Sequence, residues 1–489
     1  MSGAGAGDDV RLTAVSGAPA AFAVVVHGAA PHAAARAVTV TGVAPATGQA
    51  TTATHQLRET THAAYLDLFA ALAATFGTRP PGSRQAPVTS VAGASYRVLL
   101  TENVSPDVRD GYGDPAVLRV HETAAGGGEA WYYLLVTSND APDAFPILRS
   151  RDLADWRLVG FVFPRGRQPR WAADGAHVAD FWAPELHRVG GEYRVYFAAR
   201  ERADRSLAIG VATSAHPGGP FATPDEPLLR GGVIDPHVAV DGDGTAYLFW
   251  KDDANGVWPA RLGALLHAHG PLVAELFAGD EDRRTASLVA ALWPWARALE
   301  PMERFFVEQP LIEAVSADFA AFRARLLARR EREADADVRR AVGDVLAAMR
   351  TPVWAQRLAP DGRSLVGERT LVLENDLAWE AHLVEGVWVT PYDGRHYLFY
   401  AGNDFSTAQY GIGVAVADRL LGPYRKQDAP FLRSTAAWWG PGHPSVAEGP
   451  DGRPWLFLHA FPPGRAGYGA FRALLALPIA FDGDRVVPR

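Results

Sequence analysis

Apolar residues alternate with polar ones in short runs along most of the chain, and turn residues separate the runs. Runs such as TAYLFWKDD and RHYLFYAG are rich in aromatic residues, and the turns read DGDG, YDGR and GPDG. A period of two, bounded by Gly, Asp and Pro, is typical of short β-strands joined by tight turns. The pattern therefore predicts an all-β architecture for most of the chain.

This strand pattern repeats. The runs LAIGVATS and YGIGVAVA read as the same outer strand in two units. Five units follow one another, and they begin at Asp114, Pro184, Asp235, Glu385 and His443. Repeated units of about four strands are typical of a closed radial array. We therefore expect a five-bladed β-propeller over residues 96–489. A large β-sandwich is the alternative, but it would not explain why acidic residues recur at the starts of units.

The interval between the third and fourth units is the longest because it contains helical spacing. Within residues 259–352, Phe319, Phe322 and Leu326 share one face, as do Val338 and Val342, while charged runs such as ARREREADADVRR fill the other face. We expect a helical insertion of three to five helices in blade 3. It follows the second strand of that blade, so we expect it to cover part of the channel end that carries the acidic residues. An outward bundle used for oligomerisation is the alternative.

Residues 1–95 precede the propeller. AAFAVVVHGAA and RAVTVTGV predict strands, THAAYLDLFAALAATF predicts a strand running into a helix, and RPPGSRQAP predicts a linker. We expect a small N-terminal β-rich domain packed on the propeller in a structural role, with sugar binding as the alternative. The first residues, MSGAGAGDDVRL, lack the features of a secretory signal, and no apolar run reaches transmembrane length, so we expect a cytoplasmic protein without a membrane partner.

Composition narrows the chemistry. The chain has no cysteine, which excludes thiol catalysis, disulfides and thiolate metal sites. Its formal net charge of −8 argues against nucleic acid as a main partner. No G-x-S-x-G motif or phosphate-binding loop is present. Carboxylates therefore remain the main candidates for catalysis, and the oligomeric state stays open.

Three of the five units begin with an acidic residue. These residues are Asp114, Asp235 and Glu385, and a shared position in structural repeats would bring them to a common axis. Burying three carboxylates together is costly unless a site uses them. Any one of them alone would more simply cap a strand or a turn.

At this point the chain resembles glycoside hydrolase family 43, whose members share a five-bladed propeller. The resemblance runs from Tyr96 to Val487 without the insertion, and rests on GYGDPAV, FPILRSRDLADW, FWAPEL, IDPHVAVDGDGTAYLFWK, VEGVWV and GPGH in this order. It implies an inverting, exo-acting hydrolase that removes terminal α-L-arabinofuranosyl or β-D-xylosyl residues from oligosaccharides. Alternatives are a propeller glycosidase for galactosides or another furanoside, and a non-catalytic carbohydrate-binding propeller.

The resemblance also implies a role for each carboxylate. Asp114 would be the general base that deprotonates water, and Glu385 the general acid that protonates the leaving oxygen. Asp235 would orient the general acid and help it keep its proton through like-charge proximity. Glycosidic cleavage needs one protonated and one ionised carboxyl, in agreement with these roles. Inversion implies that base and acid lie about 6.5–9.5 Å apart, with water between them.

Other positions carry over from the resemblance with alternatives open. Trp182 would stack on a sugar ring or else pack in the core. Arg472 would donate to sugar hydroxyls or a carboxylate, or else lie on the surface. Phe145 would line the sugar pocket or be buried.

Two histidines complete the candidate residues. His443 in GPGHPSV is expected near the propeller axis, where many family members hold a hydrated calcium ion. Calcium prefers oxygen ligands, so a structural calcium near His443 and an axial histidine without a metal are both open. His237 would face the channel or only support its strand. No other cofactor is expected.

Overall fold

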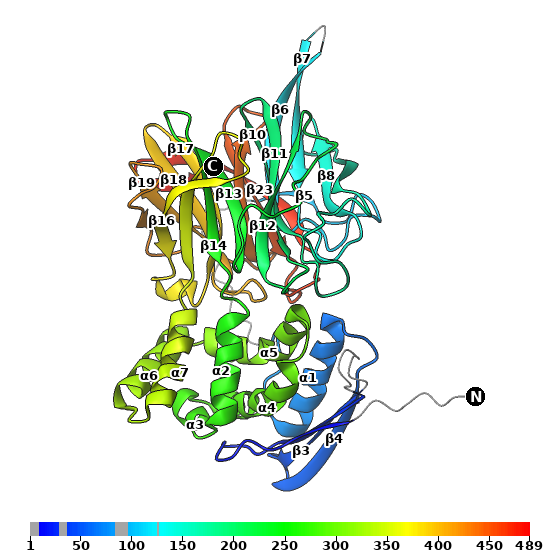
Figure 1. The fold of residues 1–489 in the computed structure, drawn as a ribbon, viewed down its shortest axis with the longest axis vertical. Coiled ribbons are helices and arrows are strands. Elements are labelled where there is room, and N and C mark those ends of the chain that lie inside the picture. The colour runs from blue at the N-terminus through cyan, green and yellow to red at the C-terminus, as the bar shows by residue number, and fades with distance from the viewer. Residues whose placement is uncertain (1–8, 29–36, 84–95, 125–126) are drawn as a thin grey trace, which may run out of the picture. The chain divides into compact units, whose positions relative to one another are not determined.

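The computed structural model describes residues 9–28, 37–83, 96–124 and 127–489 (Figure 1). Contacts divide the chain into two compact units. The mixed unit comprises Met1–Arg84 and Ala254–Arg350, and the sheet unit comprises Gln85–Asp253 and Thr351–Arg489. The N-terminal segment and the helices that interrupt the third sheet therefore share one unit. Sequence reasoning treats them separately, because no local pattern shows that two distant segments pack together.

The mixed unit combines one sheet with helices. Its antiparallel sheet has the order β1 (Val10–Leu12), β2 (Ala23–His27), β3 (Ala37–Ala44) and β4 (Gln49–Gln56). The helices are α1 (His62–Phe76), α2 (Val257–Ala268), α3 (Leu272–Leu276), α4 (Asp280–Ala296), α5 (Pro301–Ser316), α6 (Phe319–Arg332) and α7 (Ala336–Ala348). Six of these α-helices lie between two strands of the sheet unit, one more than the sequence suggests, because α3 is a single short segment without a recognisable repeat.

Local sequence explains the helix boundaries in this unit. The Thr61 side chain accepts the Ala64 N–H and caps α1, while Gly77 ends the helix in the left-handed conformation at φ 61°. Leu68 and Leu72 are buried one turn apart. The segment expected as a strand running into a helix is therefore helical from His62 onward.

Five antiparallel sheets make up the described part of the sheet unit, and each follows the chain order. The first contains β6 (Ala116–Ala124), β7 (Gly127–Leu135), β8 (Ala144–Ser150) and β9 (Arg157–Phe163), and the second β10 (Trp182–Val189), β11 (Glu192–Arg200) and β12 (Leu207–Ser214). The third contains β13 (Val233–Val240), β14 (Ala246–Asp252), β15 (Pro352–Leu358) and β16 (Leu365–Glu374). The fourth contains β17 (Val384–Tyr392), β18 (Arg395–Gly402), β19 (Gly411–Ala417) and β20 (Arg425–Lys426), and a short 3₁₀ helix, Ala378–Glu380, precedes it. The fifth contains β21 (Trp439–Glu448), β22 (Pro454–Phe461), β23 (Ala473–Asp482) and β24 (Arg485–Pro488).

The first strands of these sheets form a ring. β6 contacts β10, β10 contacts β13, β13 contacts β17, β17 contacts β21, and β21 contacts β6 again. An additional strand, β5 (Arg97–Leu100), precedes the first sheet and pairs antiparallel with β23 of the last one. This pairing joins the beginning and the end of the sheet unit. All-β architecture is thus confirmed for this unit. The described α-helices all belong to the mixed unit, and the sheet unit contains one short 3₁₀ helix.

A residue with positive φ recurs in the first half of each first strand or just before it. In the five sheets, in order, these residues are Asp114 (53°), Ala183 (46°), Asp235 (56°), Gly386 (54°) and His443 (47°). Four are not glycine, and non-glycine residues in this conformation are uncommon and concentrate at functional sites. Gly386, and not Glu385, occupies the common position in the fourth sheet, so the acidic register expected from the sequence is displaced there by one residue. Glycine takes the left-handed conformation without strain, and the side chain of Glu385 projects from the preceding residue.

No described helix is long and apolar enough to cross a membrane. Apolar residues from neighbouring sheets form the core of the sheet unit, with clusters around Phe197, Phe399 and Phe457. The alternating strands thus bury one face against the next sheet and place the ends of the first strands beside each other. These ends carry the candidate residues.

Candidate active site

Asp114 lies at the start of β6 and is surrounded by donors. Arg472 donates to its Oδ1 at 3.0 Å, and the Thr137 hydroxyl donates to Oδ2. The backbone N–H of Asp114 donates to His459 Nδ1 at 3.1 Å, which holds the residue in its left-handed conformation. Burial alone would raise the pKa of Asp114, but the charges of Arg472 and His443 more than offset it and hold the pKa well below the ordinary value. Asp114 is therefore ionised at neutral pH.

Asp235 is buried at the start of β13. Its Oδ2 accepts the backbone N–H of Gly386 at 2.9 Å, so it holds the residue next to Glu385. Burial raises the pKa of Asp235, the negative charge of Glu385 adds to this effect, and His443 and Lys251 oppose it. Asp235 thus links β13 directly to the segment that carries Glu385.

Glu385 is also buried, and both of its carboxylate oxygens have partners. The Tyr410 hydroxyl donates to Oε1 at 2.7 Å, and Lys251 Nζ lies 2.9 Å from Oε2. Burial, together with the adjacent Glu385 carboxylate, raises the pKa of Tyr410 well above its ordinary value, so this hydroxyl remains a donor. Sequence reasoning missed Lys251 and Tyr410. For Lys251 the signal was an isolated lysine within an otherwise apolar strand, FWKDD.

His443 brings the three carboxylates into one site. Its Nδ1 lies 3.5 Å from Asp114 Oδ1, and its ring lies so close to Gly386 that a Cβ there would be 2.8 Å from Nδ1. Asp235 bonds the same Gly386. Residues from β6, β13, β17 and β21 therefore meet at one end of the ring, as the sequence predicted for Asp114, Asp235 and Glu385.

Trp182 and Arg472 also lie at this site. Thr137 accepts the Ala183 N–H at 2.8 Å while its hydroxyl donates to Asp114, so the residue next to Trp182 is tied to that carboxylate. The indole N–H donates to Asn139 Oδ1 at 2.9 Å, and the ring remains partly exposed. A Cβ at Gly113 would lie 1.8 Å from the guanidinium of Arg472, so only glycine leaves room for that side chain. Arg472 thus pairs with a carboxylate rather than lying on the surface.

Phe145 is placed differently. Its side chain is 0% exposed and contacts Phe163, Phe181 and Phe197 in the core. The structure therefore favours the buried alternative over a place in the sugar pocket. An isolated aromatic residue in AFPILRS gives no local sign of which alternative holds, because burial depends on the neighbouring sheet.

Glu185, His187 and His237 form a cluster with the composition of a metal site, in which the nearest donor atoms lie within 4.8 Å of one another. The hydrogen bonds oppose that use. The Val389 N–H donates to His237 Nε2 at 2.9 Å, so Nδ1 carries the proton and donates to Glu185 at 2.8 Å. Binding a metal at Nδ1 would move the proton to Nε2, directly against the Val389 N–H. Burial lowers the pKa of His237 to about 3, which keeps the ring neutral. His237 therefore supports β17.

The surroundings of His443 can also be compared with the needs of calcium. Among the described residues, His443 contributes an imidazole, and its neighbour Asp114 is already bound by Arg472 and Thr137. Calcium takes six to eight oxygen ligands, a set that these side chains do not provide. Calcium near His443 therefore stays a prediction from the resemblance, and no step below depends on it.

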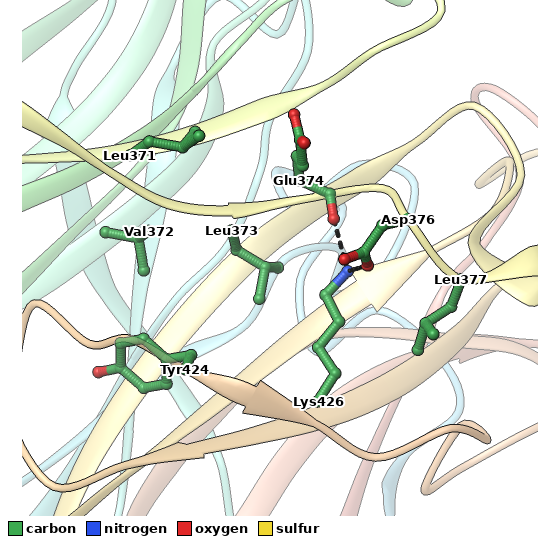
Figure 2. Close-up of a pocket in the computed structure, with 8 residues that line it drawn as sticks. All are labelled: Leu371, Val372, Leu373, Glu374, Asp376, Leu377, Tyr424 and Lys426. Atoms are coloured by element: carbon green, nitrogen blue, oxygen red, sulfur yellow. Dashed lines mark hydrogen bonds and ion pairs between the residues drawn. The ribbon is translucent and has the colours of Figure 1, made fainter.

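A pocket of about 240 Å³ lies between β16 and β20, and its lining includes none of these carboxylates (Figure 2). It is lined by Leu371, Val372, Leu373, Glu374, Asp376, Leu377, Tyr424 and Lys426. Lys426 Nζ donates to the Glu374 carbonyl, to Asp376 and to Glu380 at 2.5–2.7 Å. Its three donor positions are thus filled by partners within the protein.

Comparisons with known proteins relate this chain to glycoside hydrolases. The sequence model described as glycosyl hydrolases family 43 matches residues 106–286 and 344–487, well over half of the chain. A Humicola insolens protein named Xylosidase/arabinosidase 43A is 34% identical over 128 residues, which cover 26% of this chain and 37% of that protein. An Emericella nidulans protein named Arabinan endo-1,5-alpha-L-arabinosidase B is 36% identical over 96 residues, which cover 17% of this chain and 24% of that protein. The aligned parts thus span well under half of these relatives.

A solved structure shows the same fold. It is described as a thermostable family-43 glycoside hydrolase and superposes with a TM-score of 0.52 at 23% identity. The superposition covers 78% of this chain and 93% of that one. At this identity the likeness is one of fold alone.

Proposed function

This chain belongs to glycosyl hydrolase family 43, and from that membership we propose that it hydrolyses terminal α-L-arabinofuranosyl or β-D-xylosyl residues of oligosaccharides with inversion of configuration. The observation that carries the proposal is the pairing of Asp114 with Arg472 beside the Asp235 and Glu385 pair. One carboxylate is kept ionised, as a general base requires, and two more lie close enough for their charges to interact. The names of the relatives support the two sugars.

The five sheets are, in this proposal, the blades of a five-bladed β-propeller. The closed ring of first strands and the pairing of β5 with β23 support it, because a propeller closes by combining strands from both ends of the chain in one blade. The substrate would bind at the end of the ring where Asp114, Asp235 and Glu385 meet. Trp182 would stack on a sugar ring, and Arg472 would donate to a hydroxyl as well as to Asp114.

The proposed reaction uses the carboxylates in one step. Asp114 takes a proton from water as the water oxygen attacks the anomeric carbon. Glu385 gives its proton to the glycosidic oxygen as the bond to the leaving group breaks. Asp235 holds the Gly386 N–H and so fixes the direction of the neighbouring Glu385. Opposite roles for two carboxyl groups on the two sides of the sugar produce inversion.

Three alternatives to this proposal can be tested beside it. The name of the Emericella nidulans relative supports endo-acting cleavage of arabinan as a second candidate. A non-catalytic carbohydrate-binding propeller is a third, but such a protein would not need a half-buried, ionised Asp114 beside two further acids. A galactoside or another furanoside remains the alternative substrate within the family.

The test is hydrolysis of 4-nitrophenyl α-L-arabinofuranoside, 4-nitrophenyl β-D-xyloside and linear arabinan by the purified protein. We expect release of the chromophore from one of the glycosides, an inverted anomer as the first product by NMR, and loss of activity in Asp114→Ala and Glu385→Ala. Oligosaccharides as the first products from arabinan would show endo action instead. Binding of oligosaccharides without any hydrolysis would overturn the proposal in favour of the binding propeller.

A further inference from the structure

Lys251 is the most unusual charged residue of the site. The chain contains 47 basic residues, of which only Lys251 and Lys426 are lysines. The side chain of Lys251 is 1% exposed, although it lies in β14 and carries an ammonium group. A buried ammonium is costly unless it is paired, and its Nζ lies 2.9 Å from Glu385 Oε2. The reaction described above assigns no role to this charge.

The pairing acts directly on the group that must give up a proton. A cation next to a carboxylate stabilises its ionised form, which is the product of proton donation. Lysine suits this position because its compact charge can approach a single oxygen, whereas a guanidinium favours a planar, bidentate contact. The other oxygen of Glu385 accepts from Tyr410, a neutral donor. Lys251 is therefore the one cation placed against Glu385 among the ion pairs of the described residues.

Several other ionisable groups face this pair, and they come from each surrounding element. Five of them act on Lys251 or Glu385 directly: Asp235 in β13, Asp253 just after β14, His382 before β17, and Asp404 and Tyr410 between β18 and β19. Asp114, just before β6, and His443, in β21, act on the neighbouring Asp235. Burial lowers the pKa of His382 to about 3, so this ring is neutral, and Asp404 Oδ2 lies 3.5 Å from it. Most of the remaining groups are acidic and favour a protonated Glu385. Lys251 opposes them.

We propose that Lys251 is a positioning residue that sets the acid strength of Glu385, so that the pH at which activity falls on the basic side depends on the ammonium of Lys251. The inference rests on the proposed function, because it assumes that Glu385 is the general acid. In the transition state the proton moves from Glu385 to the glycosidic oxygen. The carboxylate that forms is stabilised by the nearby ammonium of Lys251. After the product leaves, a proton from solvent restores Glu385, and Lys251 keeps its charge throughout.

The consequence for pH dependence follows from the sign of this charge. Lys251 favours ionised Glu385, so it lowers the pH above which the acid is no longer protonated. Removing the charge while keeping the length of the side chain, in Lys251→Met, shifts the basic limb of kcat/KM to higher pH. We expect a shift of about one pH unit or more, which corresponds to a tenfold change in proton affinity. Because Glu385 is then a weaker acid, cleavage of a substrate with a sugar leaving group should slow by about tenfold. Cleavage of a 4-nitrophenyl glycoside should slow less, because 4-nitrophenol leaves with little protonation.

The experiment measures kcat/KM against pH for xylobiose or arabinobiose, whichever the wild type cleaves, with free sugar quantified by chromatography. Lys251→Gln accompanies Lys251→Met, because it keeps a hydrogen-bond donor but no charge and so folds more readily. Lys426→Met is the matched control, since Lys426 also pairs with a buried carboxylate, Glu380 Oε1 at 2.7 Å, and lies at the separate pocket of Figure 2. Circular dichroism checks the fold of each variant.

The outcomes separate the two proposals. Basic limbs shifted upward in both Lys251 variants, and unchanged in Lys426→Met, would support the inference. An active wild type with unshifted limbs in folded Lys251→Met and Lys251→Gln would overturn it and leave the proposed function intact. A shift in Lys251→Met alone would overturn it as well, because the hydrogen bond and not the charge would then matter. A wild type that cleaves no glycoside would overturn the proposed function and this inference with it.

Discussion

Replacing Arg472 by methionine should shift the acidic limb of the pH profile upward by about two pH units. The substitution removes the guanidinium 3.0 Å from Asp114 Oδ1 and keeps an apolar side chain of similar length. Asp114 must be ionised to act as a general base, so activity falls as pH decreases through its pKa. Arg472 is the largest of the charges that hold this pKa below its ordinary value, against the opposing effect of burial. Without Arg472, burial prevails and the pKa rises.

The magnitude can be worked from the distance. Two unit charges 3.0 Å apart interact by about 5 to 6 kcal/mol at an effective dielectric constant of about 20. Thr137 and His443 stay near Asp114 in the variant, and water can enter the space, so we take about half of this value. About 2.7 kcal/mol corresponds to two pH units. The shift should therefore exceed the scatter of a pH profile.

The assay is kcat/KM between pH 3 and 9 on the glycoside that the wild type cleaves. The wild-type acidic limb should lie at or below the lower end of this range, because the pKa of Asp114 is held below its ordinary value, and the Arg472→Met limb should move up into the range. Arg472 is also expected to contact sugar hydroxyls, so KM should rise, but a loss of binding alone would lower the profile without moving its acidic limb. Arg119→Met is the control, because Arg119 pairs with Glu448 and its side chain is 19% exposed, against 14% for Arg472. An acidic limb that stays at the wild-type pH in folded Arg472→Met would refute the assignment of Asp114 as a base held ionised by Arg472.

Three further predictions concern the same network and the mixed unit. Asp235→Asn can keep an oxygen for the Gly386 N–H but loses the charge, so steady-state kinetics should show kcat lowered about 10²- to 10³-fold with little change in KM. An unchanged kcat would contradict the orienting role of Asp235. Gly113→Ala places a Cβ where the guanidinium of Arg472 lies, so it should shift the acidic limb in the same direction as Arg472→Met, and a wild-type profile would disprove this contact. In the mixed unit, the Tyr65 hydroxyl donates to buried Glu303 at 2.6 Å, so Tyr65→Phe should lower the free energy of unfolding by about 1.5–3 kcal/mol in a denaturant titration. A loss below about 0.5 kcal/mol would contradict a stabilising role for this hydrogen bond.

Much of the sheet unit could be predicted because its signals are local. Alternation with a period of two, and turns such as DGDG, place strands wherever they occur, and the repeat of LAIGVATS and YGIGVAVA corresponds to β12 and β19, each the third strand of its sheet. The acidic residues at the starts of units were also visible, and the structure brings Asp114 and Asp235 to equivalent positions. Glu385 departs by one residue because the left-handed position belongs to Gly386, and a sequence motif does not reveal backbone conformation.

The partners of the candidate residues could not be predicted. Lys251 and Glu385 come from different sheets, as do Arg472 and Asp114, and nothing in either segment indicates which atoms will meet. The surroundings of Phe145 could not be predicted either, because they come from three other strands or loops. Nor could the sequence show that the N-terminal segment shares a unit with helices far along the chain. Such contacts depend on the packing of whole sheets and helices.

Repeated antiparallel sheets interrupted by helices, with Asp114, Asp235 and Glu385 as candidate acids, could be inferred from the order of the residues alone. Hydrophobic period and turn chemistry are properties of neighbouring residues, so they can be read without a fold. The electrostatics of the site emerged from the folded chain, which places Arg472 against Asp114, and Lys251 and Tyr410 against Glu385. The energy of a charge depends on its distance from other charges and on its burial, and both are set when distant strands meet.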